Sequence, residues 1–182
     1  MQTDIDALTS LVDDVFLLTR IEGGRLQLER EPLDLADCCD EAIEALAPIA
    51  HRRDVTVRLE VSTRVGVHGN APALGRVLRN LLDNAIRHAP MASVVTVTVG
   101  EGGTARVRVS DEGDGFPEGF SPHAFDQWSR ADESRSRTTG GSGLGLAIAR
   151  GLVTAHGGRI WVDRPPGGHV TFDLTTGTHT AA

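Results

Sequence analysis

The 182-residue sequence contains no lysine, so its 18 basic side chains are all arginines. This absence excludes two large classes of phosphate-handling protein. A P-loop requires the lysine of its Gly-Lys-Ser/Thr motif, and the protein-kinase fold requires a strand lysine that contacts the phosphates of ATP. A nucleotide site in this chain must therefore be of another kind.

Cysteines and long apolar runs are also scarce. The only two cysteines, Cys38 and Cys39, are adjacent in a helix-like stretch, where side chains point about 100° apart and rarely form a disulfide. We interpret them as small core or boundary residues. No apolar run approaches the roughly 20 residues of a membrane-spanning helix, and no signal peptide is apparent, so we expect an intracellular location for this part of the protein. The net charge of −7 provides no basic surface for nucleic acid.

The first helix predicted by the sequence runs over residues 3–22 and ends at Gly23-Gly24. Its apolar residues form a narrow stripe at heptad-like spacing. They are Ile5, Leu8, Val12, Val15 and then Leu18 or Thr19. Two interpretations stay open: an ordinary helix packed on its own domain, or one half of a helical hairpin that dimerises.

Hydrophobic periodicity predicts the remaining elements. A helix begins after the N-cap Asp34, with Pro48 expected to kink or end it, and another begins after the N-cap Asn70. The last helix runs to about His156. The predicted single strands are 26–31 and 55–61, and the second has a short partner at Val65 and Val67. Two hairpins are also predicted, one of 94–99 with 104–110 and a final one of 160–162 with 170–174.

These elements predict an α/β fold. We expect a two-layer α/β sandwich in which three helices cover one face of a mixed, mostly antiparallel sheet, with the N-terminal helix preceding it.

Polar residues interrupt the third predicted helix in a regular way. Asn80, Asn84 and His88 are each four residues apart and therefore lie along one line of the helix. Asparagine is a poor residue for a helix interior, so the pair indicates a function: amide oxygens that face a metal ion or a phosphate.

The segment from Asp111 to Arg150 carries the other polar signals. Asp111-Glu112-Gly113-Asp114-Gly115 follows a predicted strand, and Gly141-Ser142-Gly143-Leu144-Gly145-Leu146 opens a predicted helix. Glycines before a helix N-terminus expose backbone N–H groups that favour a phosphate. Arg130, Arg135 and Arg137 lie between the two motifs, so we predict a nucleotide pocket with an arginine-bearing cover.

These motifs, in this order and with Phe125 between the last two, resemble the N, G1, F and G2 boxes of Bergerat-fold ATPases. They are most similar to the catalytic ATP-binding domain of bacterial sensor histidine kinases. The resemblance implies a catalytic domain at 25–175, a frayed tail at 176–182, and at 1–24 the second helix of a dimerisation and phosphoacceptor domain.

The resemblance also implies roles for particular residues. Asp111 would accept a hydrogen bond from the adenine amino group, with Gly113 and Gly115 beside the base. Asn80 and Asn84 would hold Mg²⁺ and phosphate, and Arg130 and Arg135, with Asn80, would act in phosphoryl transfer. The remaining ATP-binding positions are Arg87, His88, Ser142, Gly143, Leu144, Gly145 and Leu146.

The expected target histidine is absent from the sequence. In this family the γ-phosphate passes to a helical histidine that is followed directly by an acid, and then to an aspartate of a response regulator. Here His51, His88 and His156 precede Arg, Ala and Gly. We therefore expect binding of Mg²⁺ and ATP without autophosphorylation, with the phosphoacceptor helix and the response regulator as partners. The resemblance also implies a homodimer and a cytoplasmic location in a protein anchored in the bacterial inner membrane.

The same fold also serves other functions. They are a serine-directed anti-sigma kinase, a non-catalytic ATP-binding regulatory module, or an ATPase of the chaperone, mismatch-repair or gyrase type. The orphan N-terminal helix, the intact motifs and the lack of a second large domain favour the histidine kinase.

Overall fold

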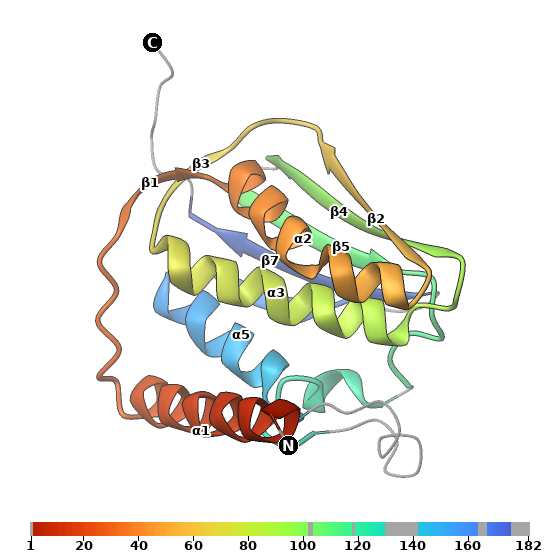
Figure 1. Ribbon diagram of the computed structural model, residues 1–182. Coiled ribbons are helices and arrows are strands. Elements are labelled where there is room, and N and C mark those ends of the chain that lie inside the picture. The colour runs from red at the N-terminus through yellow and green to blue at the C-terminus, as the bar shows by residue number, and fades with distance from the viewer. Residues whose placement is uncertain (1, 102–103, 118, 130–141, 164–166, 176–182) are drawn as a thin grey trace.

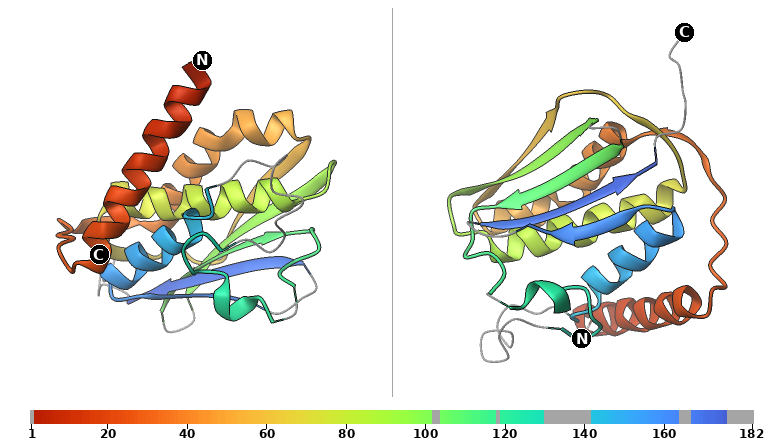
Figure 2. Two further views of the ribbon diagram at one scale, coloured as in Figure 1. Left: turned by 90° about the horizontal axis from the view of Figure 1, so that it is seen from below. Right: turned by 180° about the vertical axis from the view of Figure 1, so that it is seen from behind.

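The computed structural model describes residues 2–101, 104–117, 119–129, 142–163 and 167–175. Three helices lie side by side against one face of a twisted sheet (Figure 1). Seen from behind, the strands lie in front of these helices, so the helices occupy one face only (Figure 2). The predicted α/β two-layer sandwich is confirmed.

The elements follow in this order along the chain. The helices are α1 (Gln2–Glu22), α2 (Leu35–Arg52), α3 (Ala71–His88), the 3₁₀ helix η1 (Ser121–His123) and α5 (Gly145–Ala155). The strands are β1 (Glu31–Asp34), β2 (Val55–Val61), β3 (Gly66–Gly69), β4 (Ser93–Glu101), β5 (Ala105–Asp111), β6 (Arg159–Val162) and β7 (Gly168–Leu174).

The main sheet has five strands in the order β2-β4-β5-β7-β6. Strands β2 and β4 pair in parallel, and the other three pairings are antiparallel. The sheet is therefore mixed and mostly antiparallel, as predicted. The register of β5 against β7 places Asp111 opposite Gly168, at the end of the strand from which the candidate site begins.

The core forms between this sheet and the helices because both present apolar residues at the matching period. Alternate residues of β4, namely Val95, Val97 and Val99, are fully buried. The facing side of α3 repeats apolar residues at helical spacing, among them Leu74 and Leu78, and these are also fully buried. This packing fixes the rotation of α3 and turns Asn80 and Asn84 toward one edge of the buried face.

Both predicted N-caps are confirmed. The Asp34 carboxylate accepts a 2.7 Å hydrogen bond from the backbone N–H of Ala36, and the Asn70 amide oxygen accepts one of 3.0 Å from Ala73. Each satisfies a backbone donor that the first helical turn leaves without an intrahelical partner.

Two local predictions were wrong, and one of the two alternatives predicted at Pro48 is excluded. No strand forms over residues 26–30; the short strand β1 begins only at Glu31 and pairs antiparallel with β3. Val65 and Val67 therefore do not accompany β2, whose partner is β4. Of the two outcomes predicted at Pro48, the helix does not end there. Helix α2 continues to Arg52, because its packing against α3 and β2 outweighs the backbone hydrogen bond that proline cannot donate.

Helix α1 packs against α5 and lies outside the helical layer (Figures 1 and 2). Leu18 is buried in the common core, whereas Ile5, Leu8, Val12 and Phe16 are exposed. The heptad-like stripe is therefore divided, with its C-terminal part packed on this chain and the rest facing solvent. Within the described residues, no helix is both long enough and apolar enough to cross a lipid bilayer.

Candidate functional site

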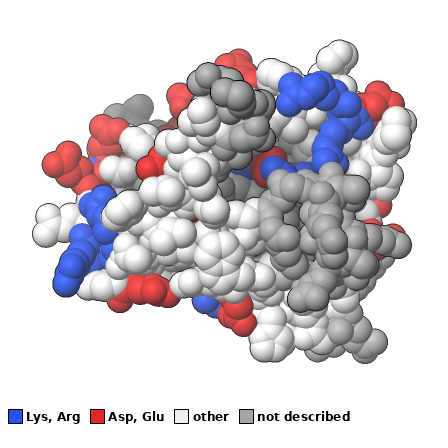
Figure 3. Space-filling model, turned by 60° about the horizontal axis from the view of Figure 1, so that its bottom comes forward, with Lys and Arg blue, Asp and Glu red and all other residues white. Residues whose placement is uncertain are grey.

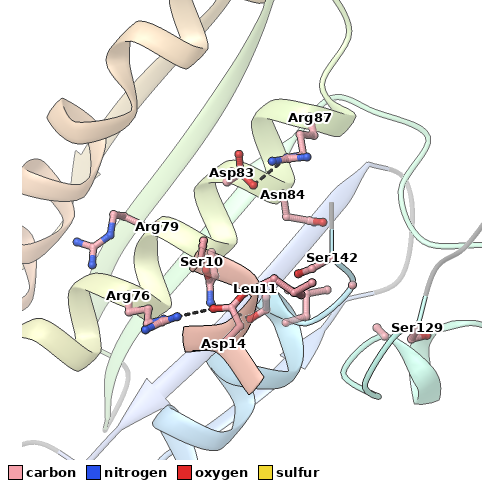
Figure 4. Close-up of a pocket in the computed structure, with 15 residues that line it drawn as sticks. Ser10, Leu11, Asp14, Arg76, Arg79, Asp83, Asn84, Arg87, Ser129 and Ser142 are labelled. Carbon is pink, nitrogen blue, oxygen red and sulfur yellow. Dashed lines mark hydrogen bonds and ion pairs between the residues drawn. The ribbon is translucent and has the colours of Figure 1, made fainter. Parts of the chain in front are cut away.

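A cavity of about 610 Å³ opens between α1, α3 and the start of α5. Figure 3 views the molecule from this side, and Figure 4 shows the lining residues. They are Ser10, Leu11 and Asp14 of α1; Arg76, Arg79, Asn80, Asp83, Asn84 and Arg87 of α3; and Ala124, Ser129, Ser142, Gly143, Gly145 and Leu146 of the later segments.

Helix α3 supplies the polar wall of the cavity. The Asn80 side-chain amide donates a 2.9 Å hydrogen bond to the backbone carbonyl of Gly145, which joins α3 to the start of α5. This bond uses the Nδ2 group and leaves Oδ1 as the ligand atom of that side chain. Further along α3, Arg87 pairs with Asp83 at 2.8 Å, and Asn84 also lines the cavity (Figure 4).

The start of α5 forms the opposite wall. Its N-cap residue Leu144 is fully buried, and no side-chain hydrogen bond caps the helix there. Ser142 accepts a 3.3 Å hydrogen bond from the N–H of Leu144 through its hydroxyl. The following N–H groups lie at a helix N-terminus beside the cavity, where the partial positive charge favours an anion.

Asp111 lies outside the lining of this cavity, at the end of β5. Its side chain is buried and accepts a 2.9 Å hydrogen bond from the N–H of Gly113. Burial raises the pKa of this carboxyl above its ordinary value, and the hydrogen bonds and the charges of His88 and His169 only partly oppose the rise. A buried carboxylate with remaining acceptor capacity is suited to receive a hydrogen bond from a ligand.

Two of the predicted glycines are required by close backbone contacts. A Cβ atom on Gly113 would lie 2.5 Å from the carbonyl oxygen of His88, at the end of α3. Gly115 has φ +74° and would bring a Cβ atom within 2.5 Å of the Gly167 carbonyl oxygen. Larger residues at either position would displace the backbone around Asp111.

The structure brings seven predicted ligand residues to the lining of one cavity: Asn80, Asn84, Arg87, Ser142, Gly143, Gly145 and Leu146. Five others lie outside that lining. His88, Asp111, Gly113 and Gly115 gather where α3 and β5 end, and Leu144 is buried beneath the start of α5. Arg130 and Arg135 are outside the described residues.

The protein ligands of a bound metal ion would be Asn80 and Asn84. Among the described residues there is no group of three His, Cys, Asp or Glu side chains placed to hold one. Mg²⁺ commonly takes few protein ligands and completes its shell with water and substrate phosphates. The neutral oxygens of Asn80 and Asn84 at a phosphate-favouring helix start therefore fit this ion.

Several lining residues were missed by sequence reasoning. Arg76 lies one turn before Asn80, so extending the four-residue spacing of Asn80 and Asn84 backwards would have found it. Asp14 and Ser10 are distant in sequence and belong to a helix assigned to another role. No local pattern connects them with the pocket.

Residues 69–178 match the family described as histidine kinase-, DNA gyrase B-, and HSP90-like ATPases. The chain belongs to this family. The predicted Bergerat-type ATPase is thereby confirmed, and its similar proteins point to one branch of the family.

The similar proteins include sensor proteins and sensor histidine kinases. The sensor protein IrlS of Burkholderia pseudomallei is 32% identical over 96% of this chain and 37% of its own length. The mycobacterial sensor histidine kinase MprB has a solved structure with a TM-score of 0.70 and 31% identity, over 81% of this chain and 97% of that one. Full-length ShkA, in complex with AMPPNP, gives a TM-score of 0.85 at 27% identity, over 97% of this chain and 37% of that one.

The ATPase domain of this chain is therefore of the sensor histidine kinase type. The chain spans little more than a third of the length of IrlS, so the match concerns one region of a larger relative.

Proposed function

We propose that this chain is the ATP-binding catalytic domain of a sensor histidine kinase, which transfers the γ-phosphate of ATP to a histidine outside this sequence. The observation that carries the proposal is the common cavity of Asn80, Asn84 and the uncapped start of α5. The family match and the AMPPNP complex of ShkA support ATP as the ligand.

Asp111 is the proposed base-reading residue. Its buried carboxylate retains acceptor capacity beyond the Gly113 hydrogen bond. The adenine 6-amino group is a donor, whereas guanine presents an oxygen acceptor at the same ring position. A carboxylate there favours adenine and repels guanine, so Asp111 predicts a preference for ATP over GTP.

The phosphates belong in the cavity beside α3 and α5. The N-terminal N–H groups of α5 and the guanidinium of Arg87 offer donors to them. Asn80 and Asn84 are the proposed ligands of Mg²⁺, which would neutralise charge on the phosphates. The family resemblance implies that Arg130 and Arg135 contact the γ-phosphate, and these contacts are part of the proposal.

The rest of the signalling cycle requires partners. The recipients would be the histidine-bearing helix of the parent kinase and then an aspartate of its response regulator. In this proposal residues 1–24 are the second helix of a dimerisation hairpin, residues 25–175 the catalytic domain and 176–182 a tail. The exposed apolar residues of α1 suit pairing in a homodimer, and the parent protein would present this domain at the cytoplasmic side of the bacterial inner membrane.

Labelled ATP tests the transfer. The chain is incubated with Mg²⁺ and γ-labelled ATP, alone and with the histidine-bearing hairpin of the parent kinase. We expect alkali-stable, acid-labile label on the hairpin and none on this chain alone. Phosphohistidine on this chain alone, or an unlabelled hairpin beside a chain that binds ATP, would contradict the proposed transfer.

A further inference from the structure

Helix α1 places an acidic side chain in the wall of the nucleotide cavity. Asp14 lines the cavity together with Arg76 of α3, and the Asp14 carboxylate forms an ion pair with the Arg76 guanidinium (Figure 4). The two side chains are only 17% and 31% exposed. The pair therefore lies partly shielded from water, where charge interactions are stronger than on an open surface.

Other contacts hold the C-terminal half of α1 in the same position. Leu18 is 6% exposed, and Ile21 lies directly over Gly151 of α5. The Glu22 carboxylate accepts a hydrogen bond from the side-chain amide of Gln127. Asp14 is thus held at the cavity by a helix that is docked through its last two turns.

Arg76 has chemistry that suits a phosphate as well as a carboxylate. It lies one helical turn before Asn80, on the side of α3 that faces the cavity. A guanidinium binds carboxylates and phosphates with the same planar set of donors. A bound triphosphate would bring several negative charges toward Asp14, which has the same sign.

We propose that Asp14 and the phosphates of the nucleotide compete for Arg76, so that docking of α1 and binding of ATP oppose one another. The inference rests on the proposed nucleotide function of this cavity. Coupling of this kind is reciprocal: ATP loosens α1, and loosening α1 strengthens ATP binding by the same factor. Arg76 is then a phosphate-binding residue that Asp14 holds when no nucleotide is present.

The first test compares two neighbouring aspartates. Asp14→Asn removes the ion pair, and Asp13→Asn removes the same charge from an exposed position of the same helix. We expect Asp14→Asn to strengthen Mg²⁺-ATP binding about fivefold relative to Asp13→Asn, the lower end of measured couplings. Adenosine, which lacks phosphates, should bind both variants equally. Equal ATP affinities of the two variants would overturn the inference.

A second variant assigns the gain to Arg76. In the Arg76→Ala background, Asp14→Asn should strengthen ATP binding by much less than fivefold over Arg76→Ala alone, because only charge repulsion remains. An undiminished fivefold gain without Arg76 would contradict the competition. Hydrogen exchange of the α1 amides gives an independent measure: ATP should accelerate it, and adenosine should not. If the unaltered chain binds no ATP, the proposed function fails; if it binds ATP without faster α1 exchange, only this inference fails.

Discussion

Burial changes the chemistry of the two adjacent cysteines. Cys38 is 8% exposed and Cys39 is fully buried. Burial, followed by the charges of nearby Glu41 and Asp37, raises the pKa of the Cys38 thiol to about 11. Burial likewise raises the pKa of the Cys39 thiol to about 12. Both side chains therefore act as small apolar core residues, which agrees with the interpretation made from their spacing.

The thiols should be unreactive until the protein unfolds. At pH 8 only about one Cys38 in a thousand would be a thiolate, the reactive form. We expect almost no labelling of the native protein by iodoacetamide, and labelling of both cysteines in guanidinium. Rapid stoichiometric labelling of the native protein would contradict this account of the α2 environment.

His156 illustrates a buried histidine with a structural role. Its Nε2 accepts a 3.0 Å hydrogen bond from the backbone N–H of Asn70, so its Nδ1 carries the proton and donates to the Leu152 carbonyl at 2.7 Å. Burial, more than the charge of Arg30, lowers the pKa of His156, and the bond to Leu152 opposes the decrease. The neutral ring therefore links the end of α5 to the N-cap of α3.

This lowered pKa predicts a pH dependence of stability. The unfolded chain binds a proton at His156 near the ordinary pKa of about 6.5, whereas the folded chain does so only at lower pH. The stabilising contribution is thus present above about pH 6.5 and is lost as the pH falls through the lowered folded pKa.

Urea denaturation at pH 5.5 and pH 7.5 measures this effect. The unaltered chain should be more stable at pH 7.5, and His156→Gln should reduce that difference. His51→Gln serves as the control because the His51 side chain is exposed. An unchanged pH difference in His156→Gln would exclude His156 as its source.

At the scale of elements, the sequence correctly predicted those features that neighbouring residues determine. The hairpin of β4 and β5 has alternating valines on both sides of a glycine-containing turn, and its existence was confirmed. The caps Asp34 and Asn70 act within three residues of the helices they begin. Such features are determined almost entirely by neighbouring residues.

Pairing between distant segments was harder to predict. Leu26 and Leu28 alternate like a strand, but they pack partly buried against the core, and strand pairing begins only at Glu31. The partner of β1 is β3, whose residues lie more than 30 positions later. The pairing of β1 with β3 depends on where α2 places both segments, and no local sequence pattern predicts it.

The docking of α1 on α5 gives an element-scale prediction. A Cβ atom added at Gly151 would lie 2.6 Å from Cγ2 of Ile21, so Gly151→Ala should push α1 away. Overpacking of this kind costs about 1 kcal/mol or more, which should accelerate hydrogen exchange in α1 roughly fivefold.

Gly75→Ala is a matched control for this change. It also places an alanine inside a helix, but its Cβ atom would meet only the end of the Arg79 side chain. Exchange in α1 should be unchanged in Gly75→Ala. Equal exchange in α1 for Gly151→Ala and the unaltered chain would show that Ile21 does not anchor the helix.

At the scale of the whole molecule, the site combines segments that are far apart in sequence. The sequence motifs identified seven residues of the cavity because α3 and the start of α5 each carry a complete local motif. The contribution of α1 could not be predicted, because its stripe indicates helix packing and contains no information about a nucleotide. The structure shows that the same helix also supplies Asp14 to the cavity.

The proposed base-reading role of Asp111 connects the fold with the proposed function. The strand order brings Asp111 to the end of β5 opposite Gly168, and the Gly113 N–H orients its carboxylate. A charge-assisted hydrogen bond in a buried site contributes roughly 1.5–3 kcal/mol. Its loss corresponds to a decrease in affinity of roughly 10- to 150-fold.

Calorimetric titration with Mg²⁺-ATP and Mg²⁺-GTP tests this claim most directly. We expect the unaltered chain to prefer ATP over GTP. Asp111→Asn should lose most ATP binding and the preference for adenine. Glu112→Gln, which removes a neighbouring exposed carboxylate, should retain ATP binding and the preference for adenine. Equal ATP affinity in Asp111→Asn and the unaltered chain would contradict the account.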